Sequence, residues 1–319
     1  MRAFSYQRPK TFAEASDLLS AANTLPLGGG TDLLVSIEEG LAAPATLVDL
    51  RSIEGNDALV EAAHGLRIGG AVRVHDLARD RRVREWYPAL AQACDAVGSP
   101  ALRHMGTIGG NLCQRPRCWY LRRGISCFKS GGSSCPARSG ENQYHAILEA
   151  GPCYIVHPSD PAVALTVLDA ELELTSRAGP RTMKISEFYA LPRERLDQET
   201  VLQPGEVVSA IVLPATFARG PQLFRKIIQR GAWDFALVSI AAAHRRDGAV
   251  RVALGGIAPR PWRVPVSVEE DVASGGLDED SIAALAERAF YDAEPLSKNG
   301  YKVTLAASLL RDAIRELAV

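Results

Sequence analysis

Hydrophobic and polar positions alternate along this chain between short helix-like and short strand-like stretches. Thr11-Phe12-Ala13-Glu14 has the form of a capping box, which predicts a helix that continues through Ala22. Residues 83–97 carry apolar side chains at helical spacing, and a second amphipathic pattern predicts a C-terminal helix from about Thr304 to Leu317.

Strand patterns lie between these helices. Residues 25–27, 46–50 and 66–72 read as short strands, and residues 163–176 read as one alternating strand. Further strands are predicted over 238–246 and 250–258. Glycine runs at 28–30 and 106–110 interrupt the pattern. The mixture predicts an α+β protein, in which two segments around glycine loops precede a separate α+β domain.

Composition and charge restrict the class of protein. The 319 residues are 47% hydrophobic, which is enough for a sizeable core, and 36 basic residues balance 37 acidic ones. This balance argues against nucleic-acid binding as the main task. The N-terminus lacks the pattern of a secretory signal and no apolar run has the length of a membrane span, so a cytoplasmic protein is the expectation.

Two stretches share a design typical of anion binding. LPLGGGTDLL (25–34) and GTIGGNL (106–112) each place adjacent glycines beside Thr or Asn. Glycine lets backbone N–H groups approach an anion closely. Neither stretch is a P-loop, and Leu33 stands where the third glycine of a dinucleotide fingerprint belongs. A tight turn is the more common explanation of one such loop, but two loops in one chain strengthen the case for a ligand with two phosphates.

The cysteines are unevenly distributed. Cys94 lies inside the helical pattern of residues 83–97 and reads as a buried core thiol. The other five fall between residues 113 and 153, with the spacing Cys113-x4-Cys118-x8-Cys127-x7-Cys135-x17-Cys153. In a reducing compartment such a cluster indicates metal or redox chemistry more often than disulfides.

Through the two glycine loops and several further motifs, the sequence resembles the FAD-binding subunit of molybdenum hydroxylases, the relatives of xanthine dehydrogenase and aldehyde oxidoreductase. GGGTDLL, TIGGN and HPSD (157–160) carry the resemblance, which PGEVV (204–208), FRKIIQRGAWDFALVSIA (224–241) and VALGGIAPRPWR (252–263) continue. It covers essentially the whole chain. It implies a two-part FAD-binding domain of the vanillyl-alcohol-oxidase (PCMH) type, with subdomains at 1–60 and 61–217, and a C-terminal α+β domain at 218–319.

The resemblance also implies a role for individual residues. Residues 25–33 are expected to wrap the FAD pyrophosphate, and the second glycine loop is expected to bind phosphate as well. Asp160 is expected to hydrogen-bond the polyol of the cofactor. Three further residues are expected near the flavin ring. The implied FAD-binding residues are Leu25, Pro26, Leu27, Gly28, Gly29, Gly30, Thr31, Asp32, Leu33, Thr107, Gly109, Gly110, Asn111, Asp160, Glu206, Val207 and Lys226. A turn residue for Asp160 and a solvated lysine for Lys226 are the alternatives.

Residues 113–153 form a long insertion between TIGGN and HPSD, and a loop of this length needs something to order it. Four thiolates suit a [4Fe–4S] cluster, whereas zinc sites usually bring two close cysteine pairs, and only Cys113 and Cys118 form one. Nearby basic residues are expected to offset the cluster's charge, and the amides of residues 131–134 to donate to its sulfurs. These basic residues are Arg115, Arg117, Arg122, Arg123 and Lys129.

The resemblance is strongest to the aldehyde oxidoreductase type, which has an extra [4Fe–4S] cluster in this insertion. The predicted ligands are Cys118, Cys127, Cys135 and Cys153. Cys113 directly follows the second glycine loop and is left out, as a buried small hydrophobe.

The function implied by the resemblance is electron transfer. A partner with two [2Fe–2S] clusters would pass electrons from a molybdopterin-binding large subunit to FAD on this chain, and an external acceptor would receive them. Such a chain is a subunit of a heterotrimer. The alternatives are the FAD subunit of a 4-hydroxybenzoyl-CoA reductase-like or xanthine dehydrogenase-like complex, a self-contained flavin oxidase, and a zinc-ordered binding protein. Export as the passenger of a signal-bearing partner would place the chain in the periplasm.

Overall fold

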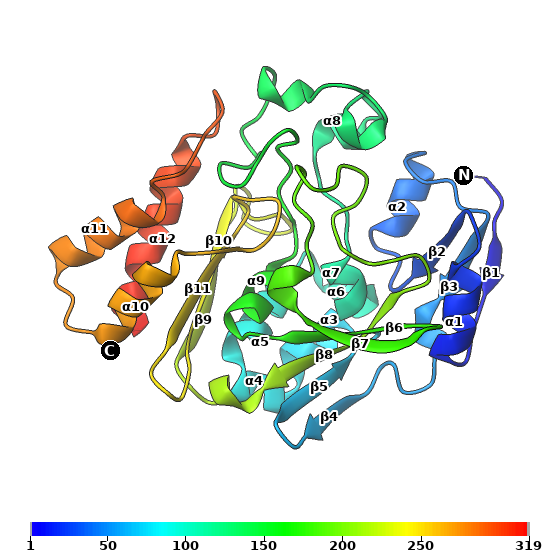
Figure 1. Cartoon of the computed structure of the whole chain (residues 1–319), viewed down its shortest axis with the longest axis horizontal. Helices are drawn as coiled ribbons and strands as arrows, with labels where there is room; N and C mark the ends of the chain where they lie inside the picture. Colours follow the sequence, from blue (N-terminus) through cyan, green and yellow to red (C-terminus); the bar gives the residue numbers. More distant parts are fainter. Residues whose placement is uncertain (1, 318–319) are drawn as a thin grey trace.

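The structure, a computed structural model, describes residues 2–317. Three separate sheets follow one another along the chain, each with helices packed against it. Figure 1 shows them as three neighbouring blocks, from the N-terminal block in blue through the middle block to the C-terminal block in yellow and red. The fold is therefore the mixed helix and strand arrangement that the sequence predicts.

The N-terminal block is a small parallel sheet in the order β1-β3-β2, comprising Ser5–Gln7, Thr46–Asp49 and Thr24–Leu27. Helix α1 (Phe12–Leu19) begins at the predicted cap, where the Thr11 side chain accepts a hydrogen bond from the Glu14 amide. It ends three residues before Ala22, because the chain turns at Asn23, whose φ is +56°, to enter β2.

The middle block is an antiparallel sheet in the order β4-β5-β8-β6-β7. Its strands are β4 (Leu59–Ala62), β5 (Gly65–Gly69), β8 (Val207–Pro214), β6 (Glu171–Ser176) and β7 (Gly179–Lys184). Six helices accompany it, α3 (Val74–Arg79), α4 (Arg81–Trp86), α5 (Pro88–Asp95), α6 (Pro100–Met105), α7 (Ile108–Leu112) and α9 (Asp160–Val167). The largest cluster of buried side chains lies here and includes Cys94, as expected for a core thiol.

Two sequence-based predictions in this block are wrong. The helix predicted over 83–97 is two helices, because Pro88 has no N–H to continue α4 and instead begins α5. The strand predicted over 163–176 begins only at Glu171, since residues 160–167 form α9. Helix α9 is buried on all sides between α5 and the third sheet, so it has no polar face to reveal its period. Its cap, Ser159 followed by Pro161, was the available signal.

The C-terminal block is an antiparallel sheet in the order β12-β11-β10-β9, comprising Trp262–Arg263, Val250–Gly255, Val238–His244 and Gln222–Ile227. Helices α10 (Val266–Ser274), α11 (Glu279–Ala289) and α12 (Tyr301–Leu317) enclose a second core with this sheet. The predicted C-terminal helix thus exists and begins three residues earlier, at Tyr301.

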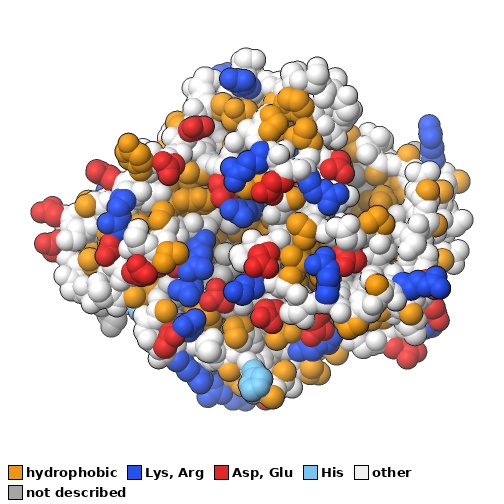
Figure 2. Space-filling view, in the orientation of Figure 1, with side chains coloured by type: hydrophobic (Ala, Val, Ile, Leu, Met, Phe, Trp, Pro, Cys, Tyr) orange, Lys and Arg blue, Asp and Glu red, His pale blue; other side chains and the backbone are white. Residues whose placement is uncertain are grey.

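The cysteine-rich segment, residues 113–153, lies along the top of the molecule in Figure 1, with α8 (Trp119–Arg122) as its one α-helix; α2 (Leu33–Glu38) lies nearby. Short 3-10 turns lie at Leu50–Ser52, Phe128–Ser130, Pro136–Arg138, Ile185–Glu187 and Ala215–Phe217. On the face drawn in Figure 2, basic and acidic side chains are interspersed. Within residues 2–317 no helix is long and apolar enough to cross a membrane.

Candidate functional site

The two glycine loops lie against each other. A Cβ on Gly29 would be 1.8 Å from the carbonyl oxygen of Met105, and one on Gly28 would be 2.5 Å from Thr107 Oγ1. The first loop needs glycine at these positions because the backbone of the second loop at Gly29, and the Thr107 side chain at Gly28, occupy the space. The sequence interpretation attributed the glycines to close approach to an anion, whereas the contacts between the loops alone are enough to require them.

The second loop is fixed by its own hydrogen bonds. Thr107 is buried and caps α7, its Oγ1 accepting a hydrogen bond of 3.2 Å from the Gly110 amide. Asn111 Oδ1 accepts a hydrogen bond of 2.6 Å from the hydroxyl of Ser159, the residue that caps α9. The 106–110 stretch was predicted as a break, but residues 108–112 form the short helix α7.

One cavity of about 830 Å³ lies along both loops. It is lined by every residue that the sequence assigned to FAD except Leu27, whose side chain is buried with Ile37 and Leu47 instead. The assigned residues that line it are Leu25, Pro26, Gly28, Gly29, Gly30, Thr31, Asp32, Leu33, Thr107, Gly109, Gly110, Asn111, Asp160, Glu206, Val207 and Lys226. These residues come from all three blocks of the fold.

Asp160 and Lys226 form an ion pair in the cavity wall. Lys226 Nζ donates a hydrogen bond of 2.7 Å to Asp160 Oδ2 and another of 3.0 Å to the carbonyl oxygen of Ala96. Both side chains are at least nine-tenths buried. Burial raises the pKa of Asp160, and the charge of Lys226 opposes that rise. Lys226 is therefore buried and paired, not solvated, although β9 is an edge strand of its sheet, and one oxygen of Asp160 is already occupied.

The carboxylate of Glu206 is occupied by hydrogen bonds from neighbouring protein groups. It accepts hydrogen bonds of 2.6 and 2.8 Å from the Arg181 guanidinium and one of 2.8 Å from the Gln203 amide. The hydrogen bond from Arg181 lowers the pKa of Glu206. The side chain thus closes the Pro204-Gly205 turn, which places Val207 on the cavity wall.

The cysteine-rich segment is fastened to the first glycine loop through Asp32. The Asp32 carboxylate accepts hydrogen bonds from the Arg115 amide at 2.8 Å and from the Arg117 and Arg122 side chains. Burial opposes ionisation of Asp32, but Arg117 and Arg122 together hold its pKa below the usual range. Nothing in the sequence pattern pairs Asp32 with residues more than 80 positions away.

The basic residues of the segment accordingly have a different role from the expected one. Arg117 and Arg122 pair with Asp32, while Arg115 and Lys129 pair with Glu199 at 3.2 and 2.9 Å. Their charges attach the segment to the rest of the protein. Of these residues, Lys129 also partly opposes the rise in the pKa of the Cys153 thiol that Cys135 and burial cause.

The four thiols assigned to a cluster share hydrogen-bond donors. The side chains of Cys135 and Cys153 lie near each other, and their interaction lowers the pKa of Cys135 and raises that of Cys153. The Cys127 sulfur accepts from the Ser130 hydroxyl at 3.5 Å. Backbone amides donate to the other three sulfurs, and these come from Tyr120, Leu121, Ala137, Arg138, Tyr154 and Ile155. The expected donation from the amides of residues 131–134 to a cluster stays a prediction.

A histidine that the sequence did not single out adjoins this group. His145 Nε2 lies 3.3 Å from the Cys118 sulfur, and burial lowers the pKa of His145 to about 4. The side chain is therefore neutral near pH 7. Among residues 2–317 no three Cys, His, Asp or Glu side chains are arranged to hold a single metal ion.

Cys113 has a different environment from the other four. It packs against the main core and lines the large cavity, and burial raises its pKa to about 12. The pKa of Tyr189 is raised by burial and also by Cys113, which places these two side chains near each other. The thiol therefore lies on the cavity side of the segment, next to the second glycine loop.

The comparisons with known proteins agree with this geometry. Residues 2–216 match the family described as FAD binding domain in molybdopterin dehydrogenase, and residues 223–317 match the CO dehydrogenase flavoprotein C-terminal domain. The chain belongs to the FAD-binding subunits of the molybdenum hydroxylase family. As a member of that family it is the flavoprotein component of an oxidoreductase.

Individual relatives cover nearly the whole chain. The chain is 37% identical to the aldehyde oxidoreductase FAD-binding subunit PaoB of Escherichia coli, over 99% of this chain and 98% of that one. It is 26% identical to the glyceraldehyde dehydrogenase medium chain of Sulfolobus acidocaldarius, with the same coverage. Carbon monoxide dehydrogenase from Hydrogenophaga pseudoflava shares the fold, with a TM-score of 0.77 at 22% identity over 99% of this chain and 97% of that chain.

Proposed function

We propose that this chain is the FAD- and [4Fe–4S]-containing electron-transfer subunit of a molybdenum-dependent aldehyde oxidoreductase. The observation that carries the proposal is a single cavity lined by both glycine loops and by a buried ion pair, next to a segment that brings four thiols together. The 37% identity to an aldehyde oxidoreductase subunit favours this type over xanthine dehydrogenase-like or 4-hydroxybenzoyl-CoA reductase-like complexes.

The cavity fits FAD in size and in the groups it offers. Its volume of about 830 Å³ lies in the upper range of ligand cavities, about 300–1,000 Å³. Residues 28–31 and 107–111 would hold the pyrophosphate, and the second carboxylate oxygen of Asp160 would accept from the polyol. Lys226 would keep that carboxylate ionised and in place. When bound, FAD supplies the ability to accept two electrons and to release them singly.

The thiol group fits an iron–sulfur cluster better than a single zinc ion. Hydrogen bonds to sulfur stabilise the thiolate form, and each of the four assigned cysteines accepts at least one or shares one. In a cubane each thiolate binds a different iron, so the thiols stand further apart than the ligands of one ion. Cys118, Cys127, Cys135 and Cys153 would be the ligands.

The proposal also covers the partner subunits, the type of the FAD domain and the domain boundaries. A small subunit with [2Fe–2S] clusters would deliver electrons from a molybdopterin-binding large subunit, giving a heterotrimer that passes them to an external acceptor. The names of the relatives as subunits and medium chains support it. We assign the FAD domain to the PCMH type, with boundaries near 60, where β4 begins the middle sheet at Leu59, and near 217, between β8 and β9.

An absorbance spectrum of the purified chain, with iron, sulfide, zinc and flavin analysis, tests this function. We expect flavin bands with a broad iron–sulfur shoulder and about four irons per flavin. Zinc in place of iron would refute the cluster, and a flavin-free chain would refute the FAD site. A monomer that oxidises aldehydes without a partner would refute the relay role.

A further inference from the structure

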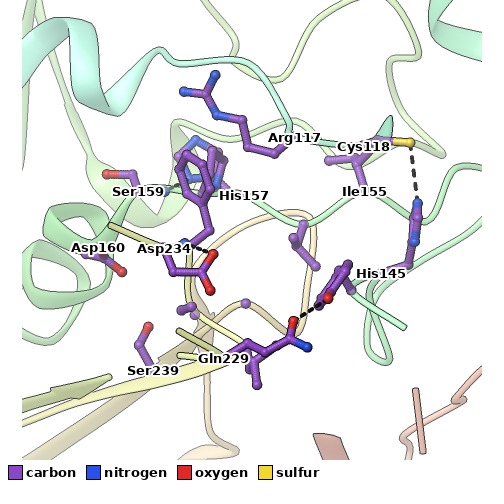
Figure 3. Close-up of a pocket in the computed structure, with 18 of the residues that line it drawn as sticks. Arg117, Cys118, His145, Ile155, His157, Ser159, Asp160, Gln229, Asp234 and Ser239 are labelled. Carbon is purple, nitrogen blue, oxygen red and sulfur yellow. Dashed lines mark hydrogen bonds between the residues drawn. The ribbon is translucent and has the colours of Figure 1, made fainter. Parts of the chain in front are cut away.

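A second cavity, of about 330 Å³, lies between the FAD cavity and the thiol group. Figure 3 shows Cys118 and His145 on one side of it and Ser159, Asp160 and Ser239 on the other. Six of its lining residues also line the FAD cavity, and they are Arg117, Pro158, Asp160, Arg230, Asp234 and Phe235. A molecule bound here would therefore touch the walls of both proposed cofactor sites.

The floor of this cavity is built from small residues of the third sheet. Ser239 on β10 pairs across the sheet with Lys226 on β9 and Gly255 on β11, so all three occupy one row. Gly255 has no side chain, and a Cβ there would lie 2.6 Å from Ser239 Oγ and 2.7 Å from a methyl group of Val163, so the row can hold the Ser239 side chain only because Gly255 is a glycine.

Ser239 carries an unused hydrogen-bonding group. The residue is 1% exposed, and among the described residues its Oγ has no hydrogen-bond partner. Figure 3 shows the hydroxyl directed inward, on the side of Asp160. A buried hydroxyl without a partner is unfavourable, and a ligand that accepts its hydrogen bond would remove this penalty.

The walls of the cavity are neutral overall. Two cationic and two anionic side chains line it, and each has a counter-ion: Arg117 pairs with Asp32, Arg230 with Asp234, and Asp160 with Lys226. His157 on the same wall is also neutral near pH 7, because burial lowers its pKa to about 3. An uncharged ligand is therefore favoured, and a phosphate-bearing one is disfavoured.

The remaining walls are aromatic and aliphatic. Trp119 and Tyr144 lie with ring centroids 5.3 Å apart, Phe235 is covered by Arg117 at 4.8 Å, and Ile155 and Leu237 complete the surface. Flat apolar walls suit a planar ring. A volume of about 330 Å³ admits a one- or two-ring molecule and is too small for a second dinucleotide.

We propose that this second cavity binds a small uncharged quinone, whose carbonyl oxygen accepts from Ser239, as the electron acceptor of the flavin site. The acceptor role rests on the function proposed above. Reduction of the quinone to its hydroquinone takes up two electrons and two protons. The reduced flavin would supply both electrons and one proton, and solvent would supply the other.

Calorimetric titration of the purified full-length chain with 2,3-dimethyl-1,4-naphthoquinone tests the binding. The substituted ring blocks addition of thiols. 2,3-Dimethylnaphthalene is the matched ligand without carbonyls. Ala236→Phe places a ring in the cavity that Ala236 lines, and Ala232→Phe makes the same change at an exposed position that lines neither cavity. Ser239→Ala removes the hydroxyl alone.

We expect one quinone per chain, an affinity lowered at least about tenfold by Ala236→Phe, and no change with Ala232→Phe. Ser239→Ala should weaken quinone binding about fivefold, the value of one hydrogen bond, without affecting dimethylnaphthalene. Wild-type affinity in a folded Ala236→Phe chain, or equal losses for both ligands in Ser239→Ala, would overturn the site. If Ala236→Phe misfolds by circular dichroism, the two-ligand comparison in Ser239→Ala decides.

The acceptor role has a separate readout. Under anaerobic conditions, reoxidation of the photoreduced flavin should saturate with quinone concentration and be at least about tenfold slower in Ala236→Phe at subsaturating quinone. Saturable binding without reoxidation would overturn the acceptor role. A chain that lacks flavin yet binds the quinone would refute the proposed FAD site and leave the cavity assignment intact, whereas a flavin-loaded chain that binds no quinone would refute the cavity assignment alone.

Discussion

Lys226 on β9 and Asp160 at the start of α9 form a buried ion pair that joins the C-terminal block to the middle block. The two residues are 66 positions apart, and each contributes to the wall of the large cavity. Because the pair lies between two blocks of the fold, it couples the shape of the cavity to the packing of the two sheets.

Removal of the lysine charge should destabilise the fold. Lys226→Met leaves the Asp160 carboxylate buried without a partner, which typically costs about 3–5 kcal/mol. Burial then raises the pKa of Asp160 further above its unfolded value, so the loss should grow as the pH rises from about 4 towards neutrality. Urea unfolding of wild type and variant at several pH values measures this. The double variant with Asp160→Asn should recover part of the loss, and additive losses would contradict the pairing.

A pH-dependent contribution is also expected from Lys302 on α12. Its side chain is fully buried, and Nζ donates to the carbonyl oxygens of Tyr144 and Gly256 at 3.0 and 2.6 Å. Burial lowers its pKa to about 7. The unfolded chain therefore binds more protons between about pH 7 and pH 10, and the contribution of Lys302 to stability should rise with pH over that range.

Lys302→Met removes this titration and serves as the reference. The unfolding free energy of the wild type relative to Lys302→Met should increase by about 2–3 kcal/mol between pH 7 and pH 9.5. Urea unfolding of both proteins at the two pH values gives the difference, in which the titration of other groups cancels. A difference that stays constant or falls would mean that the pKa of Lys302 is not lowered.

The glycine loops could be predicted from the sequence because each is a local motif. Sixteen of the seventeen positions that the motifs assign to FAD line one cavity. The exception, Leu27, is buried at the end of β2 with Ile37 and Leu47. What the motif could not reveal is that Gly29 faces Met105 of the other loop, because that contact depends on how the blocks pack.

Long-range pairings could not be predicted from the sequence, because they too depend on how the blocks of the fold pack. Arg117 and Arg122 looked like counter-charges for a cluster because they flank the cysteines, yet both pair with Asp32. His145 carried no motif of its own, and only the folded segment brings it to Cys118. Helix α9 was missed because complete burial removes the polar face from which a helical period is read.

The contact between the glycine loops gives a sharp test. Gly29→Ala would put a methyl group 1.8 Å from the Met105 carbonyl oxygen, so the second loop must shift. We expect a lower melting temperature, by several degrees, together with a lower FAD content. Gly231→Ala is the matched control, because a Cβ there meets nothing within 4 Å. A Gly29→Ala chain with wild-type stability that merely lacks FAD would show that the glycine serves the ligand and not the loop contact.

Single cysteine substitutions separate the cluster ligands from the fifth thiol. Serine replaces a soft thiolate with a hard, poorly ionised oxygen, so Cys118→Ser, Cys127→Ser, Cys135→Ser and Cys153→Ser should each lose the cluster. Binding energy at such a site is also folding energy, and the segment 113–153 should then become sensitive to proteases. Cys113→Ser should keep the wild-type iron and sulfide content, because Cys113 packs against the core and lines the FAD cavity.

The measurement is iron per flavin, with low-temperature EPR of the dithionite-reduced protein, for all five variants. Cys94→Ser is a further control, since Cys94 is buried in α5 within the main core. Loss of the cluster in Cys113→Ser, with retention in one of the other four, would show that the ligand set is wrong. Retention in all five would mean that the iron is held elsewhere, and an iron-free, zinc-loaded wild type would rule out the iron–sulfur assignment itself.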